Sequence, residues 1–144
     1  MATTPLVVER TYDAPANTVW EALTDNEKLK QWYFRLEAFR PEVGFTFSFY
    51  GGDEHTQYQH LCEVTQVVPG KKLAYTWRYE GYPGQSEVSF ELFPEGDRTR
   101  VKLTHTGLES FAGIQDKNFG VASFTQGWNY ILGTSLAHYL QGTK

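Results

Sequence analysis

The chain has 144 residues, a net charge of −4 and an aromatic content of 16%. This length is that of one ordinary domain, so we expect a single domain over residues 1–144. The negative charge and the scattered basic residues disfavour binding to nucleic acid or to an anionic membrane, and the single cysteine excludes an internal disulfide.

The N-terminal part of the chain predicts one strand followed by two short helices. Residues 6–12 (LVVERTY) are rich in β-branched side chains and place apolar residues on one face. Pro15 fits the first turn of a helix. Either Thr24 or Asp25 can cap a second helix that continues through Trp32.

The middle of the chain predicts an antiparallel meander. Apolar and polar side chains alternate in successive segments, which are separated by turns containing Gly, Pro or Asp. Such a sheet buries one face and exposes the other to water. The expected inward positions are Phe45, Phe47, Phe49, Tyr58, His60, Cys62, Val64, Leu73, Tyr75, Trp77, Tyr79, Val88, Phe90, Leu92, Val101, Leu103 and His105, with a turn at residues 94–97 before the last strand.

The C-terminal segment predicts a long helix that packs on this sheet. Gly127 and Gly133 interrupt its pattern, each at a cost of about 1 kcal/mol relative to Ala. Their presence suggests a close approach to a neighbour or a less stable helix. A sheet that wraps one long helix leaves a gap, which we expect to open near the short helices and the strand turns. The inward stripe, spaced by three and four residues, consists of Phe124, Trp128, Ile131, Leu132, Ser135 and Tyr139.

Five segments in this order resemble a known superfamily. They are ERTYDAPANTVWEALTDNEKLKQWY (9–33), RPEVGFTFSF (40–49), CEVTQVVPGKKLAYTWRY (62–79), TRVKLTHTGL (99–108) and GWNYILGTSLAHYL (127–140). Together they resemble the START-like (SRPBCC, helix-grip) superfamily, which includes the birch-pollen allergen type, polyketide cyclases and lipid-transfer domains. Within it, the chain is most similar to the AHSA-type family, named for the C-terminal domain of the activator of the heat-shock chaperone ATPase. Cys62 stands where that family usually has Gly.

The resemblance implies an α+β helix-grip fold. In this fold a curved antiparallel sheet wraps a long C-terminal helix, and two short helices follow the first strand. The geometry of this fold, together with the high aromatic content, predicts an internal cavity for a hydrophobic, aromatic or lipid-like small molecule. Most similar members are bacterial single-domain proteins whose role is not defined. The chaperone-activating role belongs to longer proteins with an additional N-terminal domain, which disfavours a chaperone partner.

The histidines and the cysteine form no recognisable catalytic or metal-binding motif. His60 and Cys62 point to the same face of a strand, where a buried thiol beside an imidazole is expected rather than a nucleophilic pair. His105 faces inward, as a structural hydrogen-bonding group or as an acid–base group. The four histidines lack metal-ligand spacing. We therefore predict no catalytic residue, no metal and no cofactor.

The aromatic side chains give the strongest functional signal. Aromatic residues at period two usually build a core, but inward-facing Tyr and Trp side chains have polar tips that need partners. We therefore predict that they line a cavity between sheet and helix. The predicted ligand-binding residues are Trp32, Tyr33, Phe47, Phe49, Tyr58, His60, Trp77, Tyr79, Phe90, His105, Phe111, Phe124, Trp128 and Ile131.

Three functions stay open at this point. The leading hypothesis is a binding protein for a hydrophobic small molecule, without covalent chemistry. The second is an enzyme of cyclase or hydrolase type that uses His105, His60 or a pocket Tyr as acid or base. The third is an interaction module, such as a chaperone ATPase co-factor or stress-response module, which predicts an exposed apolar or charged patch.

The sequence also predicts where the protein resides. It lacks a signal-peptide pattern and any apolar run near the ~20 residues that cross a bilayer. We expect a cytoplasmic protein that does not insert into membranes. The sequence does not decide whether it forms a homodimer.

Overall fold

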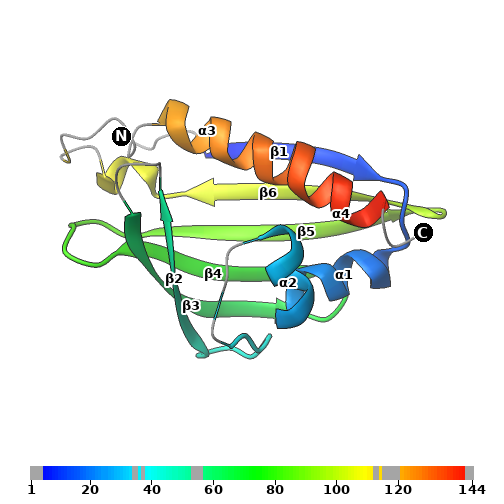
Figure 1. Ribbon diagram of the computed structural model, residues 1–144, viewed down its shortest axis with the longest axis horizontal. Coiled ribbons are helices and arrows are strands. Elements are labelled where there is room, and N and C mark those ends of the chain that lie inside the picture. The colour runs from blue at the N-terminus through cyan, green and yellow to red at the C-terminus, as the bar shows by residue number, and fades with distance from the viewer. Residues whose placement is uncertain are drawn as a thin grey trace.

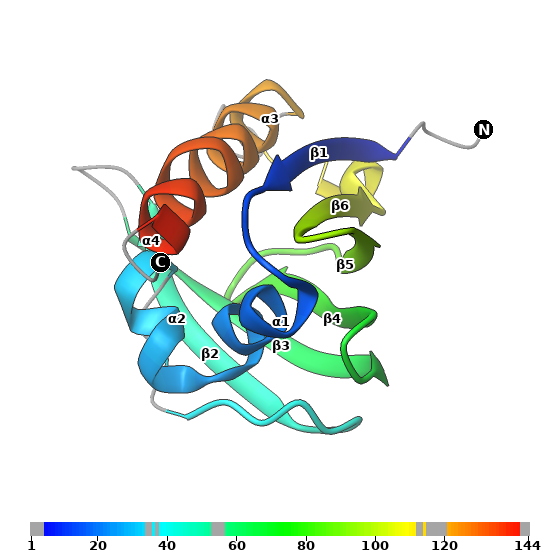
Figure 2. The same cartoon turned by 90° about the vertical axis from the view of Figure 1, so that its right-hand side faces the viewer.

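In the computed structural model, an antiparallel sheet curves around the C-terminal helix (Figures 1 and 2). The structure describes residues 5–33, 36, 38–52, 57–111, 114 and 121–141. The six strands follow the order β1-β6-β5-β4-β3-β2. They are β1 (Leu6–Tyr12), β2 (Thr46–Gly52), β3 (Gln57–Val68), β4 (Lys72–Tyr79), β5 (Ser86–Glu95) and β6 (Arg98–Thr106). The helices are α1 (Ala16–Thr24), α2 (Asn26–Trp32), the 3-10 helix η1 (Leu108–Phe111), α3 (Val121–Tyr130), the π-helix η3 (Ile131–Leu136) and α4 (Ala137–Gln141).

The predicted α+β helix-grip fold is confirmed. The alternating positions of β3 to β6 are buried as expected, and Val64, Val88 and Leu103 are fully shielded from water. Each such aliphatic or aromatic side chain contributes about 1.5–3 kcal/mol through its burial. Burial of the inner face of the sheet therefore contributes strongly to stability.

The predicted turn at residues 94–97 is shorter than expected. Pro94 and Glu95 belong to β5, and only Gly96 and Asp97 connect it to β6. Two-residue hairpin loops need a positive φ, which Gly96 provides at 69°. Pro94 is tolerated because the pairing of β5 with β4 ends at Glu91, so its missing N–H interrupts no ladder on that side.

Helices α1 and α2 lie on the inner side of the sheet (Figure 2). The Asp25 carboxylate accepts hydrogen bonds from the backbone N–H of Glu27 at 2.9 Å and of Lys28 at 3.4 Å. Asp25, rather than Thr24, is therefore the cap of α2. The Trp32 indole donates to the Ala22 carbonyl at 2.9 Å, which joins the two helices.

The C-terminal helix buries a stripe with a strict four-residue repeat. In an α-helix, four residues advance by about 400°, so this stripe would rotate by roughly 40° per step. The π-helical turn of η3 is wider and reduces this drift, so that the last two members still face the sheet. The stripe consists of Phe124, Trp128, Leu132, Leu136 and Leu140.

The predicted stripe was wrong in part for this reason. Ile131, Ser135 and Tyr139 are half-buried flanking positions, whereas Leu136 and Leu140, absent from the prediction, are buried. The prediction assumed three- and four-residue spacing throughout, and the π-helical turn changes which residues face the sheet.

Side-chain hydrogen bonds attach this helix to its neighbours. The Tyr12 hydroxyl donates to the Leu132 carbonyl at 2.7 Å, in a buried contact between β1 and η3. The Ser135 hydroxyl donates to the Trp32 carbonyl at the end of α2. These two contacts attach the π-helical segment to β1 and to α2.

The close backbone approach suggested by Gly127 is absent from the described structure. A Cβ at Gly127 would meet nothing within 4 Å, and one at Gly133 would lie 3.3 Å from Nε of Arg10. Gly127→Ala is therefore expected to raise the free energy of unfolding by about 0.5–1 kcal/mol through helix propensity, measured by urea denaturation. Gly133→Ala is the matched control, with a smaller gain because Arg10 must shift. A loss of stability in Gly127→Ala would contradict open space at that position.

Candidate functional site

The structure brings the predicted ligand-binding residues into one continuous cluster inside the sheet. All of them are buried except Tyr33 and Ile131, which are half-buried. The Phe49 and His60 rings stack at a centroid distance of 4.5 Å. The cluster continues from His60 to Trp77 at 4.8 Å and from Trp77 to Trp128 at 5.3 Å. These contacts make the cluster a packed core.

The cluster extends toward both ends of the sheet. At the end near η1, the Phe111 ring lies 5.5 Å from Tyr79 and 6.0 Å from Phe124. At the end near α2, the Tyr33 ring lies 5.1 Å from Trp32. The two ends are different environments, because α2 covers only the second.

A small void remains between α2 and the sheet, with a volume of about 10 Å³. Side chains therefore fill most of the gap at this place. Tyr75 belongs to this lining and was predicted only as an inward position, although it shares a strand face with Trp77. Leu36 and Phe39 were missed because they lie outside any periodic element. The void is lined by Leu23, Leu29, Trp32, Tyr33, Leu36, Phe39, Phe47, Leu73, Tyr75 and Phe90.

Two tyrosine hydroxyls provide a polar group at this void. The hydroxyl oxygens of Tyr33 and Tyr75 lie 2.7 Å apart. Burial raises the pKa of both phenols above their ordinary value. Both hydroxyls therefore stay protonated and can donate or accept a hydrogen bond.

His105 lies at the centre of a chain of buried hydrogen bonds. The Trp128 indole N–H, which can only donate, bonds Nδ1 of His105 at 3.0 Å. Nδ1 is therefore the acceptor, and Nε2 carries the proton that it donates to the Ser86 hydroxyl at 2.7 Å. The Ser86 hydroxyl in turn donates to the Trp77 carbonyl at 2.9 Å. Burial lowers the pKa of His105 to about 3, so the imidazole is neutral.

His60 and Cys62 are also electrically neutral. Nδ1 of His60 donates to the Tyr58 carbonyl at 2.9 Å, since a carbonyl can only accept. Burial lowers the pKa of His60 to about 4, against the opposing effect of its backbone hydrogen bonds. Burial also raises the pKa of the Cys62 thiol, which disfavours the thiolate that a nucleophile needs. Both residues have the properties of core groups.

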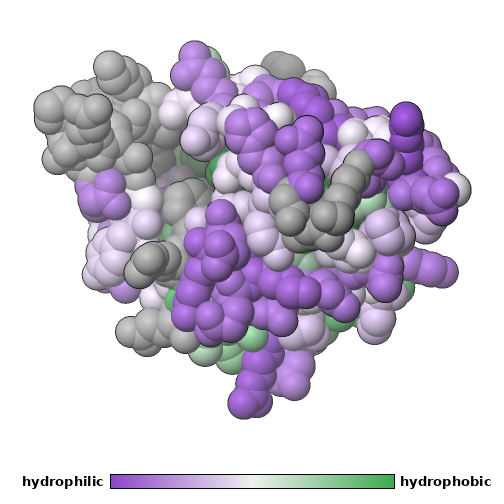
Figure 3. Space-filling model, turned by 45° about the vertical axis from the view of Figure 1, so that its right-hand side comes forward, coloured by the Kyte–Doolittle hydropathy of each residue, from purple (hydrophilic) through white to green (hydrophobic). Residues whose placement is uncertain are grey.

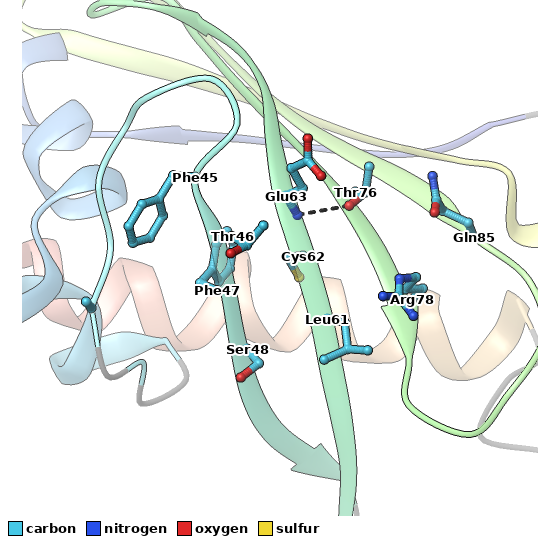
Figure 4. Close-up of a pocket in the computed structure, with 11 residues that line it drawn as sticks. Phe45, Thr46, Phe47, Ser48, Leu61, Cys62, Glu63, Thr76, Arg78 and Gln85 are labelled. Atoms are coloured by element: carbon cyan, nitrogen blue, oxygen red, sulfur yellow. Dashed lines mark hydrogen bonds between the residues drawn. The ribbon is translucent and has the colours of Figure 1, made fainter.

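A second concave region lies on the outer face of β2, β3 and β4. In Figure 4 the C-terminal helix lies behind these strands. The groove has a volume of about 590 Å³. It was not predicted from the sequence, because the alternation of a strand does not show whether its outer face is hollowed. Its lining residues are Ala38, Phe45, Thr46, Phe47, Ser48, Leu61, Cys62, Glu63, Thr76, Arg78 and Gln85. Phe45, predicted to face inward, is half-buried at the rim of this groove.

Within the described residues, no group of three or more His, Cys, Asp or Glu side chains could hold a metal ion. Over the same residues, no helix combines the length and the apolar character needed to cross a membrane. The face in Figure 3 is covered mainly by hydrophilic residues, with hydrophobic ones in small separate spots.

The sequence matches a protein-family model and several solved structures. The family model is described as activator of Hsp90 ATPase homolog 1-like protein, and it matches residues 13–141. Protein MLL2253 from Mesorhizobium loti is 28% identical, with a TM-score of 0.80, over 98% of this chain and 99% of its own. Comparison with curated proteins gives no match.

Two other similar structures belong to longer chains. DynU16, a protein in the dynemicin biosynthetic locus, is 26% identical with a TM-score of 0.79. The match covers 99% of this chain but only 49% of DynU16, so this chain spans about half of that protein. CalU16 from Micromonospora echinospora is 26% identical with a TM-score of 0.72, over 94% of this chain and 74% of its own.

Proposed function

This chain belongs to the family of activator of Hsp90 ATPase homolog 1-like proteins, and we propose that it binds an apolar, ring-bearing small molecule between α2 and the sheet. The observation that carries the proposal is the small void at this place. Its lining is aromatic and aliphatic, and the Tyr33–Tyr75 hydroxyl pair is its polar group. Small-molecule sites commonly combine an apolar lining with a few polar groups that orient the ligand.

Binding at this place requires the site to open. Pockets for drug-sized ligands have volumes of roughly 300–1,000 Å³, far more than the void of about 10 Å³. Aromatic side chains or α2 must therefore move, and the free energy of that movement reduces the apparent affinity. Helix α2 has only seven residues, and its end is attached to the long helix through the Ser135–Trp32 hydrogen bond.

One of the similar structures is compatible with a small molecule as the ligand class. DynU16 is a protein in the dynemicin biosynthetic locus. For the present chain, an apolar natural product with rings is compatible with the aromatic lining of the void. Aromatic rings contact each other favourably in offset-stacked and edge-to-face arrangements, and the Phe47 and Tyr75 rings already pack edge to face within the cluster.

The environment of His105 favours binding without covalent chemistry. The enzyme hypothesis needs an acid–base group that a substrate can reach. His105 has an exposed fraction of 0%, and both of its ring nitrogens are hydrogen-bonded. A substrate would have to break this chain of hydrogen bonds before a proton could be transferred.

Ligand binding can be tested with two ring-bearing probes, naringenin and emodin, and with palmitate as a ring-free comparison. We expect naringenin or emodin to raise the melting temperature and to change tryptophan fluorescence, because Trp32, Trp77 and Trp128 are buried in the cluster. Palmitate is expected to give a smaller response. At 100 times the Kd, binding stabilises by about 2.7 kcal/mol, which corresponds to a shift of roughly 5–10 °C.

Variants of tyrosine locate the bound molecule. Tyr75→Phe removes one hydroxyl of the pair and is expected to weaken binding by about tenfold. Tyr130→Phe, at a tyrosine that is 63% exposed on α3, is the matched control and should bind as the wild type does. Absence of any response to naringenin and to emodin, or a response to palmitate alone, would rule out the proposal.

A further inference from the structure

The groove on the outer face is separated from the interior by the sheet itself. Along β2, Phe47 and Phe49 are buried, whereas Thr46 and Ser48 are exposed. Alternate residues of a strand point to opposite faces, so the exposed pair belongs to the outer face. The exposed side chains of the groove therefore point away from the aromatic cluster, although Phe47 borders both regions.

Arg78 is the cation of this groove. Its side chain is exposed beside Leu61, its pairing partner on β3. Among the residues that the structure describes, its guanidinium makes neither a hydrogen bond nor an ion pair. Figure 4 shows Arg78 close to Gln85, with Glu63 farther along the groove, beyond Thr76. The positive and negative groups are thus placed apart.

Several other groove residues offer hydrogen bonds, beside an apolar part that includes Phe45 and Leu61. The Thr76 hydroxyl oxygen accepts from the backbone N–H of Glu63 at 2.9 Å, which leaves its hydrogen available for donation. Thr46, Ser48 and Gln85 add hydroxyl and amide groups to the lining. A groove of this composition favours a ligand with several polar groups over a purely apolar one.

We propose that this groove binds a polar organic carboxylate. The carboxylate pairs with Arg78, because a guanidinium offers two parallel donors that match its two oxygens. Hydroxyl or amide groups of the ligand bond Ser48, Thr76 and Gln85. Glu63 accepts from a ligand hydroxyl and disfavours a second negative charge. The volume of about 590 Å³ lies within the range of small-molecule sites.

The proposal concerns a different face from the internal site and can be tested independently. The full chain, labelled with ¹⁵N, is titrated with D-glucuronate and with N-acetylglycylglycine and followed by amide NMR shifts. We expect saturable shifts, with a millimolar Kd, at the amides of Ser48, Leu61 and Arg78. D-glucose and N-acetylglycinamide lack the carboxylate and are expected to give no saturable shift.

Arginine variants decide whether the groove recognises the carboxylate. Arg78→Gln is expected to weaken binding at least tenfold. Arg98→Gln, at an exposed arginine outside the groove, is the matched control and should leave the Kd unchanged. The proposal is overturned if neither acid gives saturable shifts at 20 mM, if the neutral probes bind equally well, or if Arg78→Gln binds as the wild type does. Shifts confined to the Trp77 and Trp128 indoles would also overturn it, because they report the interior.

Discussion

Replacement of His105 by alanine is expected to lower the free energy of unfolding by about 3–5 kcal/mol. Part of this loss is the cavity left by a fully buried ring. The rest arises because the Trp128 indole N–H loses its acceptor inside the core, and a buried donor without a partner costs about 1–3 kcal/mol. Urea denaturation at pH 7.5 measures the change.

Two further variants separate these contributions. His138→Ala, at an exposed histidine on α4, is the matched control and should change stability by less than about 0.5 kcal/mol. A double-mutant cycle of His105→Ala with Ser86→Ala is expected to give a coupling of about 1 kcal/mol, because these two side chains share a hydrogen bond. A loss below about 1 kcal/mol in His105→Ala would mean that the hydrogen-bonded chain is not a stabilising element.

Between pH 7.5 and pH 5.0, the free energy of unfolding is expected to fall by about 4 kcal/mol from two histidines. In the unfolded chain, His60 and His105 bind protons as the pH falls through about 6.5. In the folded protein, burial lowers their pKa to about 4 and about 3. Between these values the unfolded state binds more protons, so stability rises with pH. Each group is therefore fully favourable above pH ~6.5 and loses about 2 kcal/mol by pH 5.0.

A single substitution should halve this dependence. His60→Phe keeps an aromatic ring against Phe49 and Trp77 but cannot bind a proton. Its histidine-dependent loss between the two pH values is expected to be about 2 kcal/mol rather than 4. Urea titrations at both pH values measure this difference, with His138→Ala as the control that keeps the full loss. An unchanged pH dependence in His60→Phe would show that His60 titrates normally in the folded state.

The strand faces were predictable from sequence because one face of the sheet is buried. Tyr58, His60, Cys62 and Val64 alternate with wetter neighbours on β3, and all four are buried. A register error of one residue would expose this whole set, so the alternation carries strong information. The same reasoning placed His105 inside the fold.

The partners of these residues were not predictable. His105 meets Ser86 and Trp128, which lie 19 and 23 residues away along the chain. His105 lies on β6, Ser86 on β5 and Trp128 on α3, and no local spacing rule connects these three positions. The groove around Arg78 depends on the curvature of the sheet. The sequence of an outward-facing strand does not differ between a flat and a hollowed sheet face, so the groove could not be predicted.

The π-helical turn of η3 also constrains how many residues this helix must contain. A π-helical turn holds about one residue more than an α-helical turn, so deleting one residue between Ile131 and Leu136 would let this turn become α-helical. Leu140 would then still face the sheet, but the step across the deletion would be three residues instead of four. Relatives that have a gap of one residue at this point should therefore carry a stripe with mixed three- and four-residue spacing. In a sequence alignment, the length of this short segment and the spacing of the following leucines should change together.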